Sequence, residues 1–247
     1  MSTRRPASHC SHRSMGRHCW SGTREGAIRS RRRRKRFRMG HEIYFVRHGE
    51  STANTARVIS NKVADYAPLT AKGRQQAEEL LNRLRERGSI TAIHASPLMR
   101  AKETAEMIAL GLGLEVQIAE ALREPYCGVL EGRGDDEAWS HHARQERAWR
   151  DGHLDYSVPG GESLRDVETR LVPFLERPTL KFEQPPGNVL IVSHGSILKN
   201  MLPRVLSNVG PEFARANPIG NCDVVVAAYQ GNMLTCVEWC GLTPKTV

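Results

Sequence analysis

The sequence predicts an α/β fold in which a mostly parallel sheet lies between two layers of helices. Two observations predict it: short apolar, β-rich segments alternate with segments of helical periodicity, and the 247 residues can bury one large core. With 39% hydrophobic and 26% charged residues, the composition is that of a globular protein, and we expect no membrane span because no run of about 18 apolar residues is present. The expected architecture is a three-layer α/β/α sandwich.

The first half of this domain is predicted to contain three strands separated by two helices. Alanine and leucine recur at helical spacing in the first helix, and Gly88 is suited to end it. The expected segments are a strand at Glu42–Val46, a helix at Gln75–Arg87, a strand at Ile90–His94, a helix at Leu98–Leu110 and a strand at Glu115–Ile118.

The second half begins with residues 132 to 156, which are rich in charge and tryptophan and lack a strand pattern. They predict a helical excursion outside the sheet. The remaining expected segments are a helix at Glu162–Leu175, a strand at Val189–Val192, a helix at Ser196–Leu206 and a closing hairpin of Cys222–Tyr229 and Met233–Glu238.

The net charge of +9 is unevenly distributed. Residues 1–40 hold 13 Lys and Arg against a single acid, Glu25, whereas the rest of the chain holds 23 against 26. The Arg- and Ser-rich segment has too little apolar sequence to offset the entropy of ordering it. We therefore predict a disordered tail over residues 1–39 and one globular domain over residues 40–247.

The basic tail has several interpretations. The run Arg31–Arg36 fits a nuclear-import or nucleic-acid patch, and the acid-poor composition fits a mitochondrial transit peptide, although its apolar residues do not line one helical face. Its cysteines and histidines match no usual zinc spacing. We favour another interpretation: translation begins at Met39 and the upstream sequence is a start-site artefact, which tail peptides in the native protein would contradict. Nucleic acid is expected as a partner only through this tail.

The six cysteines form no pairing motif, and no signal peptide with an apolar core is present. We therefore expect free thiols and a cytoplasmic location. The sequence leaves the oligomeric state open.

Polar side chains follow three of the predicted strands. Arg47 and His48 follow the first strand, Arg100 follows the second, and His194 follows the Val189–Val192 strand. Ligands of parallel sheets bind where these strand ends meet, and arginine donors suit phosphate oxygens while neutral imidazole suits nucleophilic or acid-base chemistry. A single histidine after a strand is more often a capping or surface residue. Four such residues at three strand ends indicate an anion site.

A series of short motifs runs in order from about His41 to the C-terminus. The motifs are Arg47–Ser51 with Asn54, Leu69 and Thr70 with Gly73, Ser96–Leu98 with Arg100, Leu122 with Glu124, Glu131 with Gly132, Pro159–Ser163, and Ser193–Gly195. In this order they resemble the histidine phosphatase superfamily, which includes cofactor-dependent phosphoglycerate mutases and many phosphatases. The resemblance implies a phosphoglycerate mutase-like fold. The tail lies outside it.

The resemblance also implies an enzyme that works through a phosphohistidine. By it, His48 is the nucleophile and Glu124 the general acid that protonates the departing oxygen. It implies neither a metal nor a cofactor, since two arginines can supply the positive charge that Mg²⁺ supplies elsewhere. The residues expected to hold phosphate are Arg47, Asn54, Arg100 and His194, and those expected to contact substrate are Ser51, Ser60 and Gly195.

Two segments favour the phosphatase branch over the mutases. Mutases of this superfamily grip the sugar acid with a Thr-Gly pair in the loop that corresponds to Val58–Lys62, which has no glycine. They also carry adjacent arginines in the inserted region, whereas Arg144, Arg147 and Arg150 are separated here. We therefore predict a phosphomonoester hydrolase acting on a small-molecule ester, with a cofactor-dependent phosphoglycerate mutase as the alternative.

The sequence leaves two alternatives, one for the aromatic residues of the helical excursion and one for the function of the chain. Trp139, His141, His142 and Trp149 either line the substrate pocket, or the tryptophans anchor the helical excursion to the core. The chain could also be a nucleic-acid-binding protein with an inert domain. The intact set of predicted catalytic residues argues against an inert domain.

Overall fold

The computed structural model describes residues 42–63, 66–181 and 187–244, so the expectations for residues 1–39 lie outside the described residues. The described residues fall within one compact unit built on a six-stranded sheet of order β3-β2-β4-β1-β5-β6. Strands β1 to β4 are parallel, and β5 is antiparallel to both of its neighbours, which confirms the mostly parallel sheet. The strands are β1 (Glu42–Arg47), β2 (Ile90–Ala95), β3 (Val116–Ile118), β4 (Asn188–Ser193), β5 (Val224–Gln230) and β6 (Met233–Trp239).

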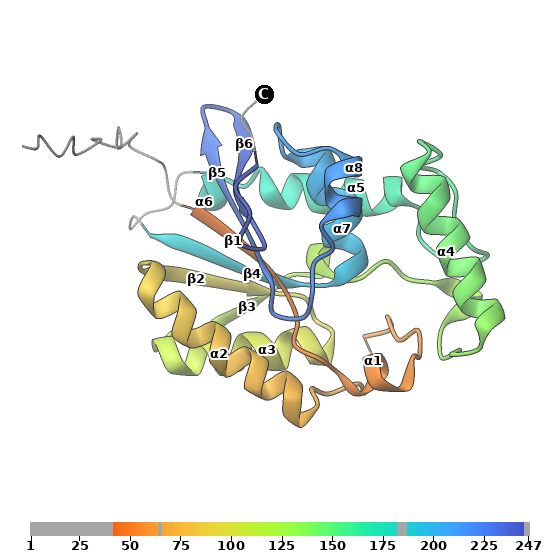
Figure 1. Ribbon diagram of the computed structural model, residues 1–247, viewed down its shortest axis with the longest axis horizontal. Helices are drawn as coiled ribbons and strands as arrows, with labels where there is room; N and C mark the ends of the chain where they lie inside the picture. Colours follow the sequence, from red (N-terminus) through yellow and green to blue (C-terminus); the bar gives the residue numbers. More distant parts are fainter. Residues whose placement is uncertain (1–41, 64–65, 182–186, 245–247) are drawn as a thin grey trace, which may run out of the picture. The chain divides into compact units, whose positions relative to one another are not determined.

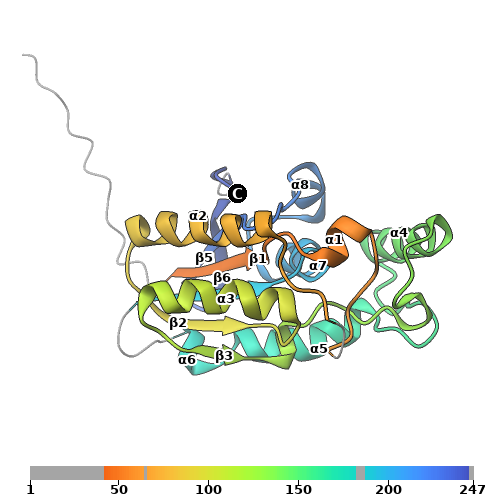
Figure 2. The ribbon, with the colours of Figure 1, turned by 90° about the horizontal axis from the view of Figure 1, so that it is seen from below.

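Helices cover both faces of the sheet (Figures 1 and 2). Helices α2 (Ala71–Arg87) and α3 (Met99–Leu112) pack on one face, and α5 (Leu164–Leu175), α7 (Gly195–Val205) and α8 (Pro211–Ala216) pack on the other. Successive side chains of a strand point to opposite faces, so β1 supplies Tyr44 and Val46 to the first layer and Ile43 and Phe45 to the second. The predicted three-layer sandwich is confirmed.

The predicted helical excursion is α4 (Asp136–Arg150), which lies beyond the end of the sheet (Figure 1). Ala138 of this helix packs into a separate small cluster formed largely by loop residues, the other members being Ile59, Cys127, Leu130 and Val158. The excursion therefore has its own core. It forms one wall of the cavity described below.

The sequence did not predict three short helices and two 3-10 turns. Helix α1 (Thr52–Ala56) buries no residue and therefore has no apolar periodicity to detect. Four to six residues are also too few for such a pattern in α6 (Pro178–Lys181) and α8. The two 3-10 turns are η1 (Glu120–Leu122) and η2 (Gly128–Leu130).

Close backbone packing fixes the loop that follows β1. A side chain at Gly49 would collide with the backbone of Gly73, and one at Gly73 would collide with the backbone of Glu50. Thr70 begins α2 by accepting the Gly73 N–H, and its own hydroxyl donates to Glu50. The loop is thus held against the first turn of α2, which starts four residues before the predicted Gln75.

No helix among the described residues is long and apolar enough to cross a membrane. The four cysteines of the described part, Cys127, Cys222, Cys236 and Cys240, are free thiols.

Candidate active site

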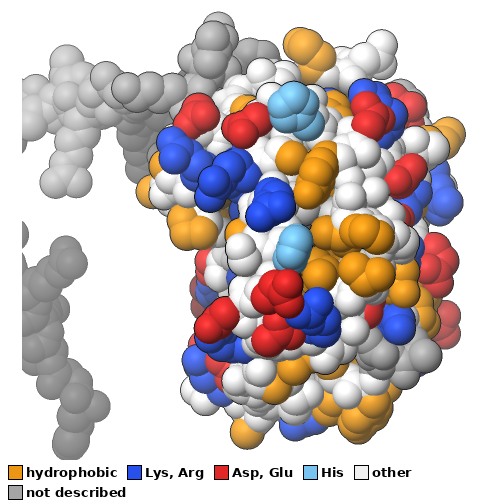
Figure 3. All heavy atoms as spheres, turned by 90° about the vertical axis from the view of Figure 1, so that its right-hand side faces the viewer, with side chains coloured by type: hydrophobic (Ala, Val, Ile, Leu, Met, Phe, Trp, Pro, Cys, Tyr) orange, Lys and Arg blue, Asp and Glu red, His pale blue; other side chains and the backbone are white. Residues whose placement is uncertain are grey.

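A cavity of about 420 Å³ lies at the edge of the sheet where β1 and β4 end. The two strands end at the same level, because Arg47 pairs with Ser193. The next residue after each strand is a histidine, and the ring centroids of His48 and His194 are therefore only 5.1 Å apart. The side of the molecule that carries α1 and α4 mixes acidic, basic and hydrophobic side chains (Figure 3). Seven of the predicted site residues line the cavity: Arg47, His48, Asn54, Ser60, Arg100, Glu124 and Gly195.

His48 is 3% exposed and held in one orientation and one tautomer. Its Nδ1 lies 2.7 Å from the Gly49 carbonyl oxygen, and Arg100 Nε lies 3.0 Å from its Nε2. A carbonyl only accepts and a guanidinium only donates, so the ring proton is on Nδ1. Nε2 therefore carries the lone pair, which is the requirement for a nucleophile.

The surroundings of both imidazoles favour the uncharged form. Burial, and after it the charge of Arg100, lower the pKa of His48 well below its ordinary 6.5, although the bond to Gly49 acts in the opposite direction. Burial and Arg100 lower the pKa of His194 in the same way. At neutral pH both rings are therefore uncharged, and His48 keeps its lone pair.

We expect nitrogen NMR of the substrate-free protein to show His48 and His194 uncharged at pH 6.5. In the unfolded chain they take up protons near 6.5, so the free energy of unfolding should fall as the pH drops below about 6.5. Arg100→Met should raise the pKa of His48, because it removes a neighbouring cation. A His48 that titrates at or above 6.5 in the unaltered protein would contradict this description.

Two buried atoms of the site lack a hydrogen-bond partner. Across residues 42–63, 66–181 and 187–244, Arg47 Nε and His194 Nδ1 are the only buried side-chain nitrogens or oxygens without one. An unpaired buried polar group costs about 1–3 kcal/mol, so such atoms are rare outside ligand sites. The Ser96 hydroxyl lies 2.6 Å from His194 Nε2, and if it donates there, Nδ1 carries a proton to offer. Both atoms suit a ligand rich in oxygen acceptors.

Glycine at position 195 leaves room for the Arg47 guanidinium. A side chain there would begin 3.2 Å from Arg47 Nε. The same guanidinium donates through Nη1 to the carbonyl oxygen of Ile219 at 2.8 Å, which fixes its orientation.

Arg100 joins His48 to the loop after α1. Its Nη1 donates to the Ser60 carbonyl oxygen at 2.7 Å and its Nη2 to Asn61 Oδ1 at 3.1 Å. Asn61 in turn donates to the carbonyl oxygen of Pro125. The guanidinium is therefore positioned from two directions before any ligand binds.

Glu124 is held at the N-terminus of α7. Its two carboxylate oxygens accept the backbone N–H groups of Ser196 and Ile197, each at 2.9 Å. A helix N-terminus favours negative charge, and each oxygen keeps a second lone pair for a proton or a substrate atom. The carboxyl group is thereby fixed on the wall of the cavity.

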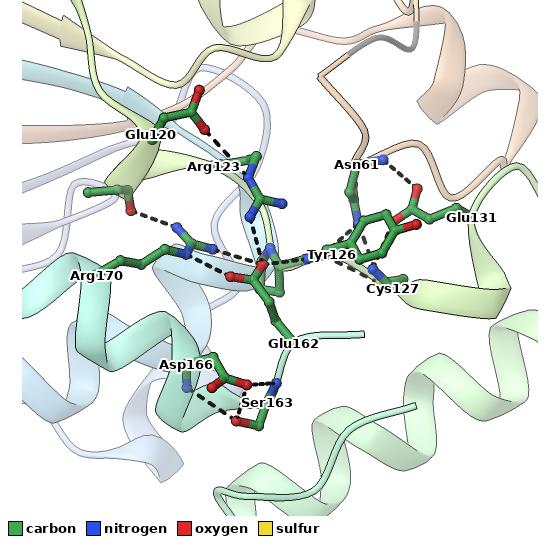
Figure 4. A network of polar contacts seen from close by, with 12 residues as sticks. Asn61, Glu120, Arg123, Tyr126, Cys127, Glu131, Glu162, Ser163, Asp166 and Arg170 are labelled. Atoms are coloured by element: carbon green, nitrogen blue, oxygen red, sulfur yellow. Dashed lines mark hydrogen bonds and ion pairs between the residues drawn. The ribbon is translucent and has the colours of Figure 1, made fainter. Parts of the chain in front are cut away.

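A second network holds the segment that carries Glu124 (Figure 4). Glu162 accepts hydrogen bonds from Arg170 at 3.0 Å, from Arg123 at 3.2 Å and from the Tyr126 backbone N–H at 2.8 Å. Arg123 and Tyr126 flank Glu124 closely in the chain. The Pro159–Ser163 motif therefore contributes a positioning carboxylate for the Glu124 loop.

Ser51 and Asn54 form the cap of α1. The Ser51 hydroxyl and backbone N–H both donate to Asn54 Oδ1, at 3.2 and 3.1 Å, and the Asn54 N–H donates back to the hydroxyl. Asn54 lines the cavity, whereas Ser51 does not. Of the three residues expected to contact substrate, the structure thus places Ser60 and Gly195 on the cavity wall.

The aromatic residues of the excursion divide between the two interpretations. Trp139 and His142 line the cavity, and His141 does not. Trp149 is 3% exposed, packs in the main core and donates from Nε1 to the carbonyl oxygen of Tyr156 at 2.8 Å. The pocket interpretation is wrong for Trp149, which anchors α4.

Sequence analysis missed several residues that shape the site. Asn221 donates to the His48 carbonyl oxygen at 2.8 Å, and Ile219 and Asn61 orient the two arginines. Contacts made through backbone carbonyls leave no trace in side-chain identity, so no pattern could have found Ile219. Glu146 of α4 and Lys199 of α7 also line the cavity. Neither belongs to a motif, so the sequence did not single them out.

A family model and curated relatives match most of the chain. The model of the histidine phosphatase superfamily (branch 1) matches residues 43–241. An Escherichia coli protein named "Probable phosphoglycerate mutase GpmB" is 34% identical over 200 residues, which cover 80% of this chain and 89% of that protein.

Solved structures with the same fold include two phosphatases. The α-ribazole phosphatase of Shigella flexneri is 25% identical with a TM-score of 0.65, covering 83% of this chain and 98% of that one. Mycobacterial glucosyl-3-phosphoglycerate phosphatase is 22% identical with a TM-score of 0.69, covering 82% of this chain and all of that one. At 22% identity the likeness shows the fold alone.

Proposed function

Because the chain belongs to the histidine phosphatase superfamily, we propose that it hydrolyses phosphate monoesters through a phosphohistidine intermediate on His48. The observation that carries the proposal is the lone pair of His48 Nε2 together with two buried nitrogens that lack partners, Arg47 Nε and His194 Nδ1. His48 and Arg47 line the cavity, and the His194 ring, which does not line it, lies 5.1 Å from the His48 ring. Phosphoryl transfer needs an in-line nucleophile and positive charge around the equatorial oxygens. These residues supply both.

In the first half-reaction His48 Nε2 attacks phosphorus and the bond to the ester oxygen breaks. Arg47, Arg100 and His194 donate to the phosphoryl oxygens, so that Arg100 exchanges its bond with Nε2 for one with the ligand. Glu124 gives its proton to the departing oxygen, and the alcohol leaves. Asn54, exposed at the cavity rim, is available for a further bond to phosphate.

In the second half-reaction water attacks the phosphorus of the phosphohistidine. Glu124, now ionised, accepts a proton from that water, and the bond between phosphorus and Nε2 breaks. Inorganic phosphate leaves and His48 regains its lone pair. The same carboxyl group thus acts first as acid and then as base.

Hydrolysis and mutase chemistry differ in what receives the phosphoryl group: water, or a sugar acid held in the cavity. The name of the E. coli relative favours a mutase. The cavity favours a hydrolase, because within the described part of the chain none of the α4 arginines, Arg144, Arg147 and Arg150, lines it. Lys199, which does line it, is already paired with Glu146. A bound sugar acid would need such cations for its carboxylate.

Phosphorus NMR of the protein in a chelator separates the two activities. We expect inorganic phosphate to appear from phenyl phosphate, and 3-phosphoglycerate with a trace of its bisphosphate to give no rapid 2-phosphoglycerate. Rapid formation of 2-phosphoglycerate would make the protein a mutase. Formation of neither inorganic phosphate nor 2-phosphoglycerate would contradict both activities.

A further inference from the structure

One face of α4, together with Lys199 of α7, forms a wall of the cavity that the proposed mechanism does not use. Trp139, His142, Ala143 and Glu146 follow the i, i+3, i+4, i+7 spacing, so they lie on the same side of the helix. All of them line the cavity, as does Lys199. They are placed to contact the part of a substrate that lies beyond its phosphate.

Glu146 and Lys199 form an ion pair on this wall. Lys199 Nζ lies 2.7 Å from Glu146 Oε2, and the two side chains are 34% and 13% exposed, respectively. The Ser196 hydroxyl donates to the other carboxylate oxygen of Glu146 at 2.8 Å. A largely desolvated pair adds little stability over packed apolar side chains, so stability alone does not account for its place on a cavity wall.

Glu146 is charged at neutral pH. Burial alone would raise its pKa, but the charge of Lys199, and that of His142, outweigh burial and hold the pKa below its ordinary value. Glu146 is therefore a hydrogen-bond acceptor and not a proton donor. Its role differs from the one proposed for Glu124.

The pair adjoins the site of the departing oxygen. Ser196 connects the two carboxylates: its backbone N–H donates to Glu124 and its hydroxyl donates to Glu146. The atoms attached to the leaving oxygen would therefore lie beside Glu146 and Lys199. Trp139 adds an aromatic surface, which is fixed by a 2.7 Å bond from Nε1 to the Arg57 carbonyl oxygen.

We propose that Glu146, Lys199 and Trp139 select phosphate esters whose leaving group is polyhydroxylated, as in a sugar or a cyclitol. This inference rests on the proposed hydrolase function. A hydroxyl both donates and accepts, so neighbouring hydroxyls can donate to the carboxylate and accept from the ammonium. The apolar side of a sugar ring can lie against the indole. A leaving group with no hydroxyls besides the ester oxygen would desolvate both charges without replacing their hydrogen bonds to water.

The test compares two esters with the same ring, myo-inositol 1-phosphate and cyclohexyl phosphate. The variant carries Glu146→Gln and Lys199→Met together, since removing one partner would leave the other as an unpaired, partly buried charge. We expect the unaltered protein to prefer the inositol ester in kcat/KM, and the double variant to lower that preference by about tenfold to a hundredfold.

The matched control is Glu168→Gln, which removes the 3.5 Å pair between Glu168 and Arg204 outside the cavity and should leave the preference unchanged. Equal losses on both esters in the double variant would overturn the inference, because they would show a purely structural role. So would an unaltered protein that does not prefer the inositol ester. Absence of phosphate release from both esters would instead contradict the proposed hydrolase function.

Discussion

Replacing His48 by alanine should lower kcat/KM for phenyl phosphate by about four orders of magnitude or more, because the covalent route loses its acceptor atom. Within the described part of the chain, the imidazole beside His48 does not provide an equivalent acceptor. His194, the neighbouring imidazole, points Nε2 at the Ser96 hydroxyl, 2.6 Å away. For His194 to act as a second nucleophile, Nδ1 would have to lose the proton that it offers to phosphate, or the ring would have to turn and break the bond to Ser96.

The control for His48→Ala is His153→Ala. His153 is exposed and does not line the cavity, so its replacement should leave kcat/KM unchanged. Thermal unfolding of both variants separates loss of activity from loss of fold. If His48→Ala keeps a substantial part of the activity, the covalent route through this residue is wrong.

Glu124→Gln should impair esters in proportion to the basicity of their leaving group. Glutamine cannot donate a carboxyl proton, so alcohols that leave poorly without protonation should lose about 10²- to 10⁴-fold in kcat/KM. p-Nitrophenyl phosphate, whose leaving group departs as a stable anion, should lose far less. The quantity to compare is kcat/KM, because it reports the steps up to departure of the alcohol.

The same variant should slow the second half-reaction, since Glu124 also accepts the proton of the attacking water. With p-nitrophenyl phosphate we therefore expect a burst of nitrophenol followed by slow turnover. Glutamine keeps one acceptor for the N–H groups of Ser196 and Ile197, so the start of α7 should remain formed. Equal losses for good and poor leaving groups would place the acid at another residue.

The longest helices could be predicted because their apolar residues are periodic, and the strands because they are short apolar, β-rich runs. In α2, Ala77, Leu80 and Leu84 face the core of the domain. The side chains of β1 and β4 alternate between the two helical layers. The position of the site followed from topology, since the residues after parallel strands share one edge of the sheet. His48 and His194 are neighbours for this reason.

The rest of the site depends on contacts that have no period. Asn61 and Asn221 act through single amide groups in loops, and Ile219 acts through its backbone carbonyl oxygen. Glu146 lies on α4, whose position is set by Ala138 in the small loop cluster and by Trp149 in the main core. Helical spacing puts Glu146 on the face of Trp139, but only the packing of α4 shows that this face meets the cavity.

The proposed mechanism requires a covalent bond between phosphorus and His48 Nε2. The measurement that tests it is rapid quenching of Glu124→Gln with p-nitrophenyl phosphate under alkaline conditions, which preserve phosphohistidine, followed by peptide mass spectrometry. We predict stoichiometric phosphate on the peptide that contains His48, formed at the rate of the burst and absent from a variant that also carries His48→Ala. Continued release of phosphate with no phosphorylated His48, or with phosphate on another residue, would contradict the account.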